Sequence, residues 1–253
     1  MRKKKSIWFI AILVFICIGL LIPAYNYYAP ATERPAYTCQ QYQDDTIRIA
    51  MIGDSWVFFH YQYNDTLADL INQKTGKPVK VSAYGICGKT SKEIYQSFFD
   101  DQIMKALLEQ GADYCFISVG INDTYKKMGA RYFSKSTICI LHFLLQNNIK
   151  PILMEIPNYE ISCVYIRQTI CRKLIRRLSM LITNSSVDCI EDYRQTLMRE
   201  LCKESLDNQI IILRHTWSIG QYQTDRMHLN NIGYKALDSC ISSCIITSKD
   251  SNR

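Results

Sequence analysis

Several features that would direct an interpretation elsewhere are missing from this sequence. It has no internal repeat and no low-complexity tract, which argues against a solenoid or fibrous protein. No spacing of its four histidines and eleven cysteines resembles a zinc site, and we expect neither a metal nor another cofactor. The formal net charge is +7, but residues 2–5 supply four of these charges. The rest of the chain is too nearly neutral to indicate nucleic acid as a partner.

Charged residues are also absent between Lys5 and Glu33, and part of this stretch is strongly apolar. From Ile7 to Ile22 every residue except Gly19 is apolar, which is close to the length of a membrane span. The basic residues before it predict a cytoplasmic N-terminus. We therefore expect residues 1–28 to form an N-terminal transmembrane helix, an uncleaved signal anchor. The rest would lie on the outer side, periplasmic or extracellular.

Two other interpretations of this segment were weighed. A cleaved signal peptide would use Ala29-Pro30-Ala31, the only small-residue site, which lies rather far from the apolar run. A lipoprotein signal is disfavoured because bulky Ile16 precedes Cys17. The outer compartment would permit disulfides among the ten cysteines beyond the run, but their pairing cannot be read from sequence. Cys115, within an apolar run, is expected to be a buried small hydrophobe.

The remaining chain is long enough for one globular domain. We expect residues 29–45, rich in Pro, Gln, Tyr and Thr, to form an extended linker, residues 46–247 the domain, and residues 248–253 a tail. Short apolar runs alternate with helical patterns such as 138–147 and 161–182. This alternation predicts an α/β fold, a three-layer α/β/α sandwich around a mostly parallel five-stranded sheet. The expected strands are Ile47–Ile52, Val79–Ala83, Tyr114–Val119, Ile152–Ile156 and Val187–Ile190.

Small polar turns follow the first three of these strands. They are Gly53-Asp54-Ser55, the glycine-rich stretch 84–91, and the stretch 120–123. Each has a plain structural explanation: a helix cap by Asp54 or Ser55 in the first turn, a turn capped by Thr90 or Ser91 in the second, and a simple turn in the third. The carboxyl ends of parallel strands meet at one edge, however, so the three turns should converge in space.

A carboxylate and a histidine lie close together near the C-terminus. Asp225 precedes His228 by three residues, ahead of an amphipathic helix expected from about residue 231 to 245. At this spacing Asp225 can accept the Nδ1 proton of His228 and leave Nε2 facing a serine. This is the relay that a serine nucleophile needs.

Together these residues resemble the SGNH hydrolases, also called GDSL-type esterases. Ser55 matches the family's first block, Gly88 the second, Asn122 the third, and Asp225 with His228 the last. The stretch 225–234 is the most specific match, and the resemblance covers residues 47–245. It implies a flavodoxin-like SGNH hydrolase fold and a serine hydrolase acting on carboxylic esters.

The resemblance also implies a role for each matched residue. Ser55 would attack an acyl carbonyl, His228 would take its proton, and Asp225 would orient the imidazole. The oxyanion hole would consist of the backbone N–H groups of Ser55 and Gly88 and the side-chain amide of Asn122.

The sequence leaves the substrate open. An exported, tethered domain favours O-acyl esters, in the first place O-acetyl esters, of envelope or exported carbohydrates. A lipid-directed esterase or lysophospholipase is an alternative, supported by the anchor and by Trp56, Phe58 and Phe59 beside the nucleophile. An O-acyltransferase using the same acyl-enzyme and a non-catalytic glycan-binding module are further alternatives.

Two departures from the family pattern concern the substrate. Trp56 replaces the family's leucine, and residues 190–224 exceed the usual short connection. With Trp217 and Tyr222, this insertion is either a lid or wall of the acyl pocket, or a surface excursion.

The other three histidines and a basic run have less specific explanations. His142 is expected in the core, His60 was considered as a substrate contact, and His215 has no carboxylate at a comparable spacing. The basic residues of the run 172–177 are expected on a solvated helix face, with Leu174, Ile175 and Leu178 pointing inward. Tethering could also bring this basic run near anionic lipid or acidic glycan.

Overall fold

Five parallel strands form the centre of the computed structural model, which describes residue 19 and residues 22–250. Their order in the sheet is β2-β1-β3-β4-β5. The bounds are β1 Ile47–Gly53, β2 Val79–Gly85, β3 Tyr114–Ser118, β4 Lys150–Met154 and β5 Ile211–Leu213. In the register Gly53 lies opposite Gly85 and Ser118, so the turns that follow these three strands meet at one edge. The expected parallel sheet is confirmed, and every pair in it is parallel.

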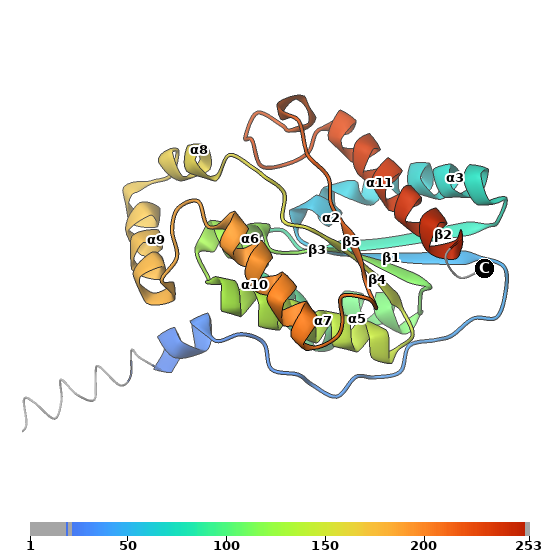
Figure 1. Cartoon of the computed structure of the whole chain (residues 1–253), viewed down its shortest axis with the longest axis horizontal. Coiled ribbons are helices and arrows are strands. Elements are labelled where there is room, and N and C mark those ends of the chain that lie inside the picture. The colour runs from blue at the N-terminus through green and yellow to red at the C-terminus, as the bar shows by residue number, and fades with distance from the viewer. Residues whose placement is uncertain (1–18, 20–21, 251–253) are drawn as a thin grey trace, which may run out of the picture.

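Helices cover both faces of this sheet (Figure 1). One face carries α2 (Ser55–His60), α3 (Asn64–Thr75) and α11 (Asn231–Asp250). The other carries α4 (Ser91–Asp100), α5 (Gln102–Glu109), α7 (Ala130–Gln146) and α10 (Ile190–Lys203). The remaining elements are η1 (Tyr61–Tyr63), α6 (Ile121–Lys126), α8 (Ile161–Ile166), α9 (Ile170–Thr183) and η2 (Ile219–Gln221). The three-layer α/β/α architecture is therefore as expected.

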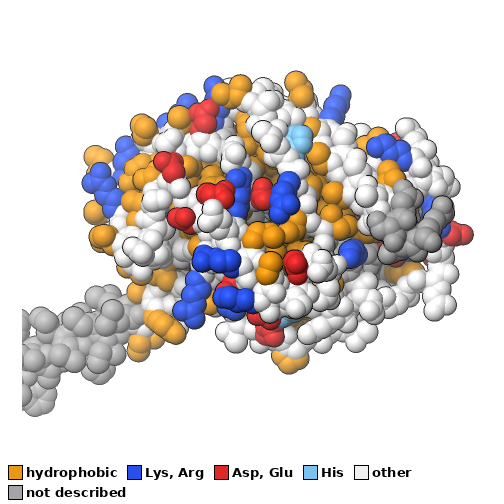
Figure 2. All heavy atoms as spheres, in the orientation of Figure 1, with side chains coloured by type: hydrophobic (Ala, Val, Ile, Leu, Met, Phe, Trp, Pro, Cys, Tyr) orange, Lys and Arg blue, Asp and Glu red, His pale blue; other side chains and the backbone are white. Residues whose placement is uncertain are grey.

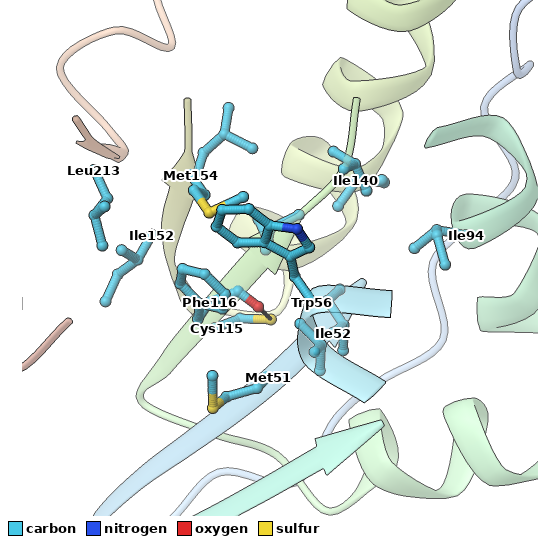
Figure 3. Close-up of a cluster of buried hydrophobic side chains, with 14 of the residues drawn as sticks. Met51, Ile52, Trp56, Ile94, Cys115, Phe116, Ile140, Ile152, Met154 and Leu213 are labelled. Carbon is cyan, nitrogen blue, oxygen red and sulfur yellow. Dashed lines mark hydrogen bonds between the residues drawn. The ribbon is translucent and has the colours of Figure 1, made fainter. Parts of the chain in front are cut away.

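The core fills the space between the sheet and its two helical layers. Strands buried on both faces need apolar side chains at successive positions rather than alternate ones, and Met51, Ile52, Cys115 and Phe116 are all fully buried. Figure 3 shows them in one cluster with Trp56, the residue after the candidate nucleophile. Cys115 is the buried hydrophobe that the sequence predicted.

The fifth strand is not where the sequence placed it. Residues 187–190 form no strand; Ile190 instead begins α10, and the strand beside β4 is β5, twenty residues further on. A short apolar run fits a buried helix start as well as a strand, which explains the error. The stretch 190–224 is consequently neither a lid nor a surface excursion, because it supplies the crossover helix α10 and the strand β5.

The long helical pattern 161–182 is divided into α8 and α9. The expectation that Leu174, Ile175 and Leu178 point inward is wrong, since all three are exposed. Within α9 the buried residues are instead the polar Arg176 and Ser179. Helical periodicity defines an apolar face but does not say which way that face points.

Residues 29–45 are extended, as expected of a linker, and they pack along the domain. The backbone N–H of Ala31 donates to Ser136 Oγ at 3.0 Å, and Tyr37 Oη–H donates to the Phe98 carbonyl at 3.0 Å. Cys39 is only 1% exposed. We call this segment the packed linker; it contacts α4, α5 and α7 before the chain enters β1.

The predicted membrane anchor falls largely outside the described residues. Within 19 and 22–250, no helix has the length and apolarity that crossing a membrane requires. The ten cysteines of the described part of the chain are all free thiols.

Candidate active site

The turn after β1 places Ser55 at the carboxyl edge of the sheet, as the first residue of α2. Gly53 has a φ of 152°, and a Cβ there would lie 2.2 Å from the Ser118 carbonyl oxygen, so only glycine fits between the two strands. Asp54 caps α2 by accepting the Trp56 N–H at 3.1 Å, which is the cap the sequence allowed. The turn thereby directs the Ser55 hydroxyl out of the strand.

Ser55, His228 and Asp225 form one chain of hydrogen bonds. The distance between Ser55 Oγ and His228 Nε2 is 2.9 Å, and that between His228 Nδ1 and Asp225 Oδ2 is 2.5 Å. With Nδ1–H donating to the carboxylate, Nε2 accepts from the serine hydroxyl. The structure thus brings together the three residues that the sequence proposed as a relay, although they span 173 positions of the chain.

Asp225 is held in place by its own loop. Its Oδ1 accepts the backbone N–H groups of Met227 at 2.9 Å and of His228 at 3.0 Å. Partial burial raises the pKa of this carboxyl, but the hydrogen bonds from His228 and Met227 outweigh it and keep the pKa below its ordinary value. Asp225 is therefore ionised near neutral pH and can stabilise a positive charge on the imidazole.

Contacts from the end of the stretch 190–224, for which the sequence left a lid, a wall of the acyl pocket and a surface excursion open, support the histidine loop. Tyr222 pairs with Leu229 in an antiparallel bridge, and the Gln223 N–H donates to the His228 carbonyl at 2.7 Å. Trp217 and Tyr222 are buried, with their rings 5.3 and 6.3 Å from the Trp56 ring. A lid role for these two aromatics is thus wrong.

Trp56 connects the nucleophile's helix to the same loop. Its Nε1–H donates to the Met227 carbonyl at 3.0 Å. This hydrogen bond fixes α2, which carries Ser55, relative to the residue next to His228. Trp56 therefore has a structural role between the two halves of the relay.

The predicted oxyanion donors lie at the same edge. Gly88 has a φ of 76°, with open space where a Cβ would be. Among the hydrogen bonds of the described residues, none uses the backbone N–H of Ser55 or Gly88. Asn122, in the first turn of α6, is 8% exposed. Its Nδ2 donates to Asp54 Oδ2 at 3.3 Å, which leaves the second amide proton for another acceptor.

Asp54 has a further function that the sequence did not reveal. Besides capping α2 it accepts the Ser118 hydroxyl at 3.1 Å and the Asn122 amide, so it orients the proposed oxyanion donor. Burial raises its pKa to about 7, although hydrogen bonds from Trp56 and Ser118 oppose this. In the sequence, the only indication of a role for Asp54 was its position in the turn, which predicted a helix cap and no further contact.

A second buried carboxylate, that of Asp123, links two of the turns through hydrogen bonds. Asp123 accepts the backbone N–H of Ser91 at 2.9 Å and its hydroxyl at 2.6 Å. Burial raises the pKa of Asp123 to about 6. Thr90 caps the start of α4, as the sequence allowed. The hydrogen bonds of Asp123 link this helix start to the start of α6, so Asn122 and the loop that contains Gly88 are held together.

Aromatic side chains border the relay on one side. Phe58 and Phe59 are exposed on α2, and the Phe59 ring centroid lies 5.5 Å from that of His228. This apolar surface therefore lies beside the imidazole of the relay.

The other histidines do not join the site. His60 is fully buried, with Nε2 2.5 Å from Asp238 Oδ1, so it cannot contact a substrate. His142 is half-buried and pairs with Glu33, and His215 Nδ1 lies 3.4 Å from Cys240 Sγ. No cluster of metal-ligating side chains occurs among the described residues.

Solved structures of several ester hydrolases have the same fold. A GDSL-like lipase from Bacteroides thetaiotaomicron has a TM-score of 0.53 at 16% identity over 79% of this chain and 88% of its own. A lipase/acylhydrolase from Enterococcus faecalis has a TM-score of 0.53 at 16% identity, covering 78% of this chain and 94% of its own. An acetylxylan esterase from Geobacillus stearothermophilus has a TM-score of 0.52 at 15% identity, covering 79% and 94%.

No protein-family model matches the sequence, and no curated protein matches it. The fold is nevertheless the one that the resemblance to GDSL-type, or SGNH, hydrolases implied.

Proposed function

We propose that this protein is a serine esterase that cleaves O-acyl esters through an acyl-enzyme. The observation that carries the proposal is the continuous hydrogen-bonded chain from Ser55 through His228 to Asp225. A serine hydroxyl is a weak nucleophile unless an adjacent base removes its proton during attack. The geometry here provides that base and a carboxylate that orients it.

In the first half of the reaction, Ser55 Oγ attacks the carbonyl carbon of the ester while its proton passes to His228 Nε2. The carbonyl oxygen becomes an oxyanion, which the amide of Asn122 and the N–H groups of Ser55 and Gly88 would stabilise. The bond from the carbonyl carbon to the alcohol oxygen then breaks. The leaving alcohol takes the proton from His228, and the acyl group remains on Ser55.

In the second half, water attacks the acyl-enzyme and gives its proton to His228. The Ser55–acyl bond breaks, the carboxylic acid leaves, and the proton on His228 returns to Ser55 Oγ. Asp225 stays ionised throughout, because its hydrogen bonds hold its pKa low.

The substrate class we propose is an O-acyl ester, in the first place an O-acetyl ester, of an envelope or exported carbohydrate. An acetylxylan esterase is among the proteins with the same fold. The basic leader and the apolar run 7–22 support a single-pass signal anchor with a cytoplasmic N-terminus and the hydrolase domain outside. Acylated glycans are found on that side of the membrane.

A lipid-directed esterase is the second candidate, favoured by one observation. Phe58 and Phe59 are exposed beside the relay, and an apolar wall of this kind suits a long acyl chain. Transfer of the acyl group to a sugar hydroxyl instead of water would use the same acyl-enzyme.

The test is an assay of the purified protein on acetylated glycans and on p-nitrophenyl esters of increasing chain length. Acetate release from glycans, with turnover falling as the acyl chain lengthens, is the expected result. A rise with chain length would favour the lipid esterase, and acylated acceptor without free acid would indicate transfer. Turnover by Ser55→Ala equal to that of the wild type on every substrate would refute the proposal.

A further inference from the structure

Helix α9 exposes an apolar surface that no other described element covers. Among its residues, Ile170 is 83% exposed and Leu181 is 79% exposed, which is unusual for large aliphatic side chains on a folded domain. Six exposed aliphatic residues make up what we call the α9 apolar face: Ile170, Leu174, Ile175, Leu178, Leu181 and Ile182.

These residues lie on one side of the helix. At about 100° of rotation per residue they fall within an arc of roughly 140°. Arg176, Ser179 and Thr183 lie on the opposite side, where Arg176 and Ser179 are buried. The helix is therefore amphipathic in the reverse sense for a globular protein, with its polar side toward the domain and its apolar side toward the surroundings.

Specific polar contacts hold α9 in this orientation. The guanidinium of Arg176 lies 3.5 Å from the centroid of the Tyr125 ring, in a cation–π contact. Thr183 Oγ1–H donates to the Lys127 carbonyl at 3.1 Å. Because these groups face the domain, the apolar face cannot be buried by rolling the helix without losing them. Something outside the described chain must cover it.

The position of the N-terminal segment indicates what covers the α9 apolar face. Tyr28 Oη and Ser179 Oγ are 2.6 Å apart, so residues 22–28, which are helical, lie against α9 (Figure 1). Tyr25 and Ile182 line one pocket between the two segments. The apolar run 7–22 joins this segment directly, so the point where the chain would leave a membrane lies at the C-terminal part of α9, next to Ile182.

The basic residues of α9 are also consistent with a membrane surface against this face. Exposed Arg177 and half-buried Lys173 border the apolar face along one edge, whereas exposed Arg172 lies on the side of Arg176 and Ser179. In Figure 2, apolar and basic side chains gather at the edge of the molecule where α9 lies in Figure 1. Apolar residues that enter the acyl region, with basic residues at the level of anionic headgroups, are the pattern of a helix lying in a membrane interface.

We propose that α9 lies in the surface of an anionic bilayer, with its apolar face among the acyl chains, and so docks the domain onto the membrane beside its anchor. The inference rests on the proposed anchorage and is independent of the esterase activity. Exposed Tyr25 and Tyr27 on the adjoining segment would lie at the same interfacial level.

Photolabelling of the full-length protein tests this. The protein is reconstituted in phosphatidylcholine–phosphatidylglycerol vesicles containing a phospholipid with a diazirine on its acyl chain, and tryptic peptides are mapped by mass spectrometry. Peptide 178–194 carries half of the α9 apolar face, and peptide 93–105 carries the exposed Ile103 of α5 as a control. The anchor lies in peptide 6–48, since trypsin does not cleave between Arg34 and Pro35. We expect acyl-chain adducts on 6–48 and 178–194, each several-fold above 93–105.

Two substitutions sharpen the test. L178E with L181E should reduce adducts on 178–194 several-fold and leave those on 6–48, whereas I103E should change neither; all these side chains are exposed, so folding should not be disturbed. Adducts on 6–48 alone would overturn the docking and leave the anchor intact. Adducts on neither peptide would overturn both.

Discussion

Asp54 connects three features of the site through one carboxylate. It caps the helix that begins at Ser55, it accepts the hydroxyl of Ser118 at the end of β3, and it accepts the amide of Asn122. An amide with one proton already engaged has a fixed rotamer, so its second proton has a defined direction. Asn122 is thus pre-oriented before any substrate arrives, which is what transition-state stabilisation by a donor requires.

Asn122→Ala should lower kcat by about a hundredfold to a thousandfold, roughly 2.7 to 4 kcal/mol, with a smaller change in KM. Negative charge develops on the carbonyl oxygen only as Ser55 attacks, so the donor favours the transition state over bound substrate. Steady-state kinetics and a melting curve on the same variant check this. A lowered melting temperature with kcat within a few fold of the wild type would mean that Asn122 is only a turn residue.

A fluorophosphonate probe should label the wild type and neither Ser55→Ala nor His228→Ala. Only a serine with an adjacent base attacks such a probe near neutral pH, and members of one relay are not additive. His142→Ala is the matched control, since this histidine pairs with Glu33 far from the site, and it should be labelled like the wild type. Labelling of Ser55→Ala at the wild-type level would remove Ser55 from its proposed role.

The pKa of Asp54, about 7 in the folded protein against an ordinary value of 3.8, predicts a pH effect on stability. The folded state binds this proton more tightly than the unfolded state. The resulting contribution to stability is fully present below pH about 4 and is lost as pH rises through about 7.

Asp54→Asn removes this titration. Its free energy of unfolding should therefore fall less than that of the wild type between about pH 4 and pH 8. Denaturant titrations of both proteins at several pH values measure the difference. Parallel pH profiles would contradict the raised pKa.

At the scale of elements, the sequence was most informative where a loop follows a parallel strand. The turns that carry Ser55, Gly88 and Asn122 were expected to converge because β1, β2 and β3 end at the same edge, a consequence of topology. The choice of these three residues within the turns came from the resemblance to SGNH hydrolases. The contact between Asp54 and Asn122 depends on side-chain rotamers, which a linear pattern does not encode. β5 was missed because three residues at the edge of a sheet leave almost no periodicity, whereas the start of α10 resembled a strand.

The packed linker is an element whose contribution to stability can be measured. Tyr37 is half-buried against Phe99 and Phe143, so Tyr37→Ala should lower the free energy of unfolding by about 1–3 kcal/mol. The matched control is Arg34→Ala, whose ion pair with Asp100 is exposed and should contribute about 1 kcal/mol or less. Denaturant unfolding measures both. If Tyr37→Ala matches the control, the linker is separable from the domain, and a chain shortened through Tyr37 should keep its stability.

For the whole molecule, the proposed orientation predicts one-sided protease access. In sealed, oriented membrane vesicles, a protease added on the outer side should digest the domain, and the same protease confined to the cytoplasmic side should not. The basic leader and the apolar run motivate this expectation. Recovery of the intact full-length chain in the soluble cytosolic fraction would refute it.

The packed linker also limits how far the domain can lie from the proposed anchor. Free and fully extended, residues 29–45 would separate the domain from the end of that anchor by roughly 55 Å. Because Ala31, Tyr37 and Cys39 are hydrogen-bonded to the domain, almost none of this length is free to extend. The relay would therefore lie at a nearly constant height above the bilayer. A substrate of any length would have to bring its ester group to that height.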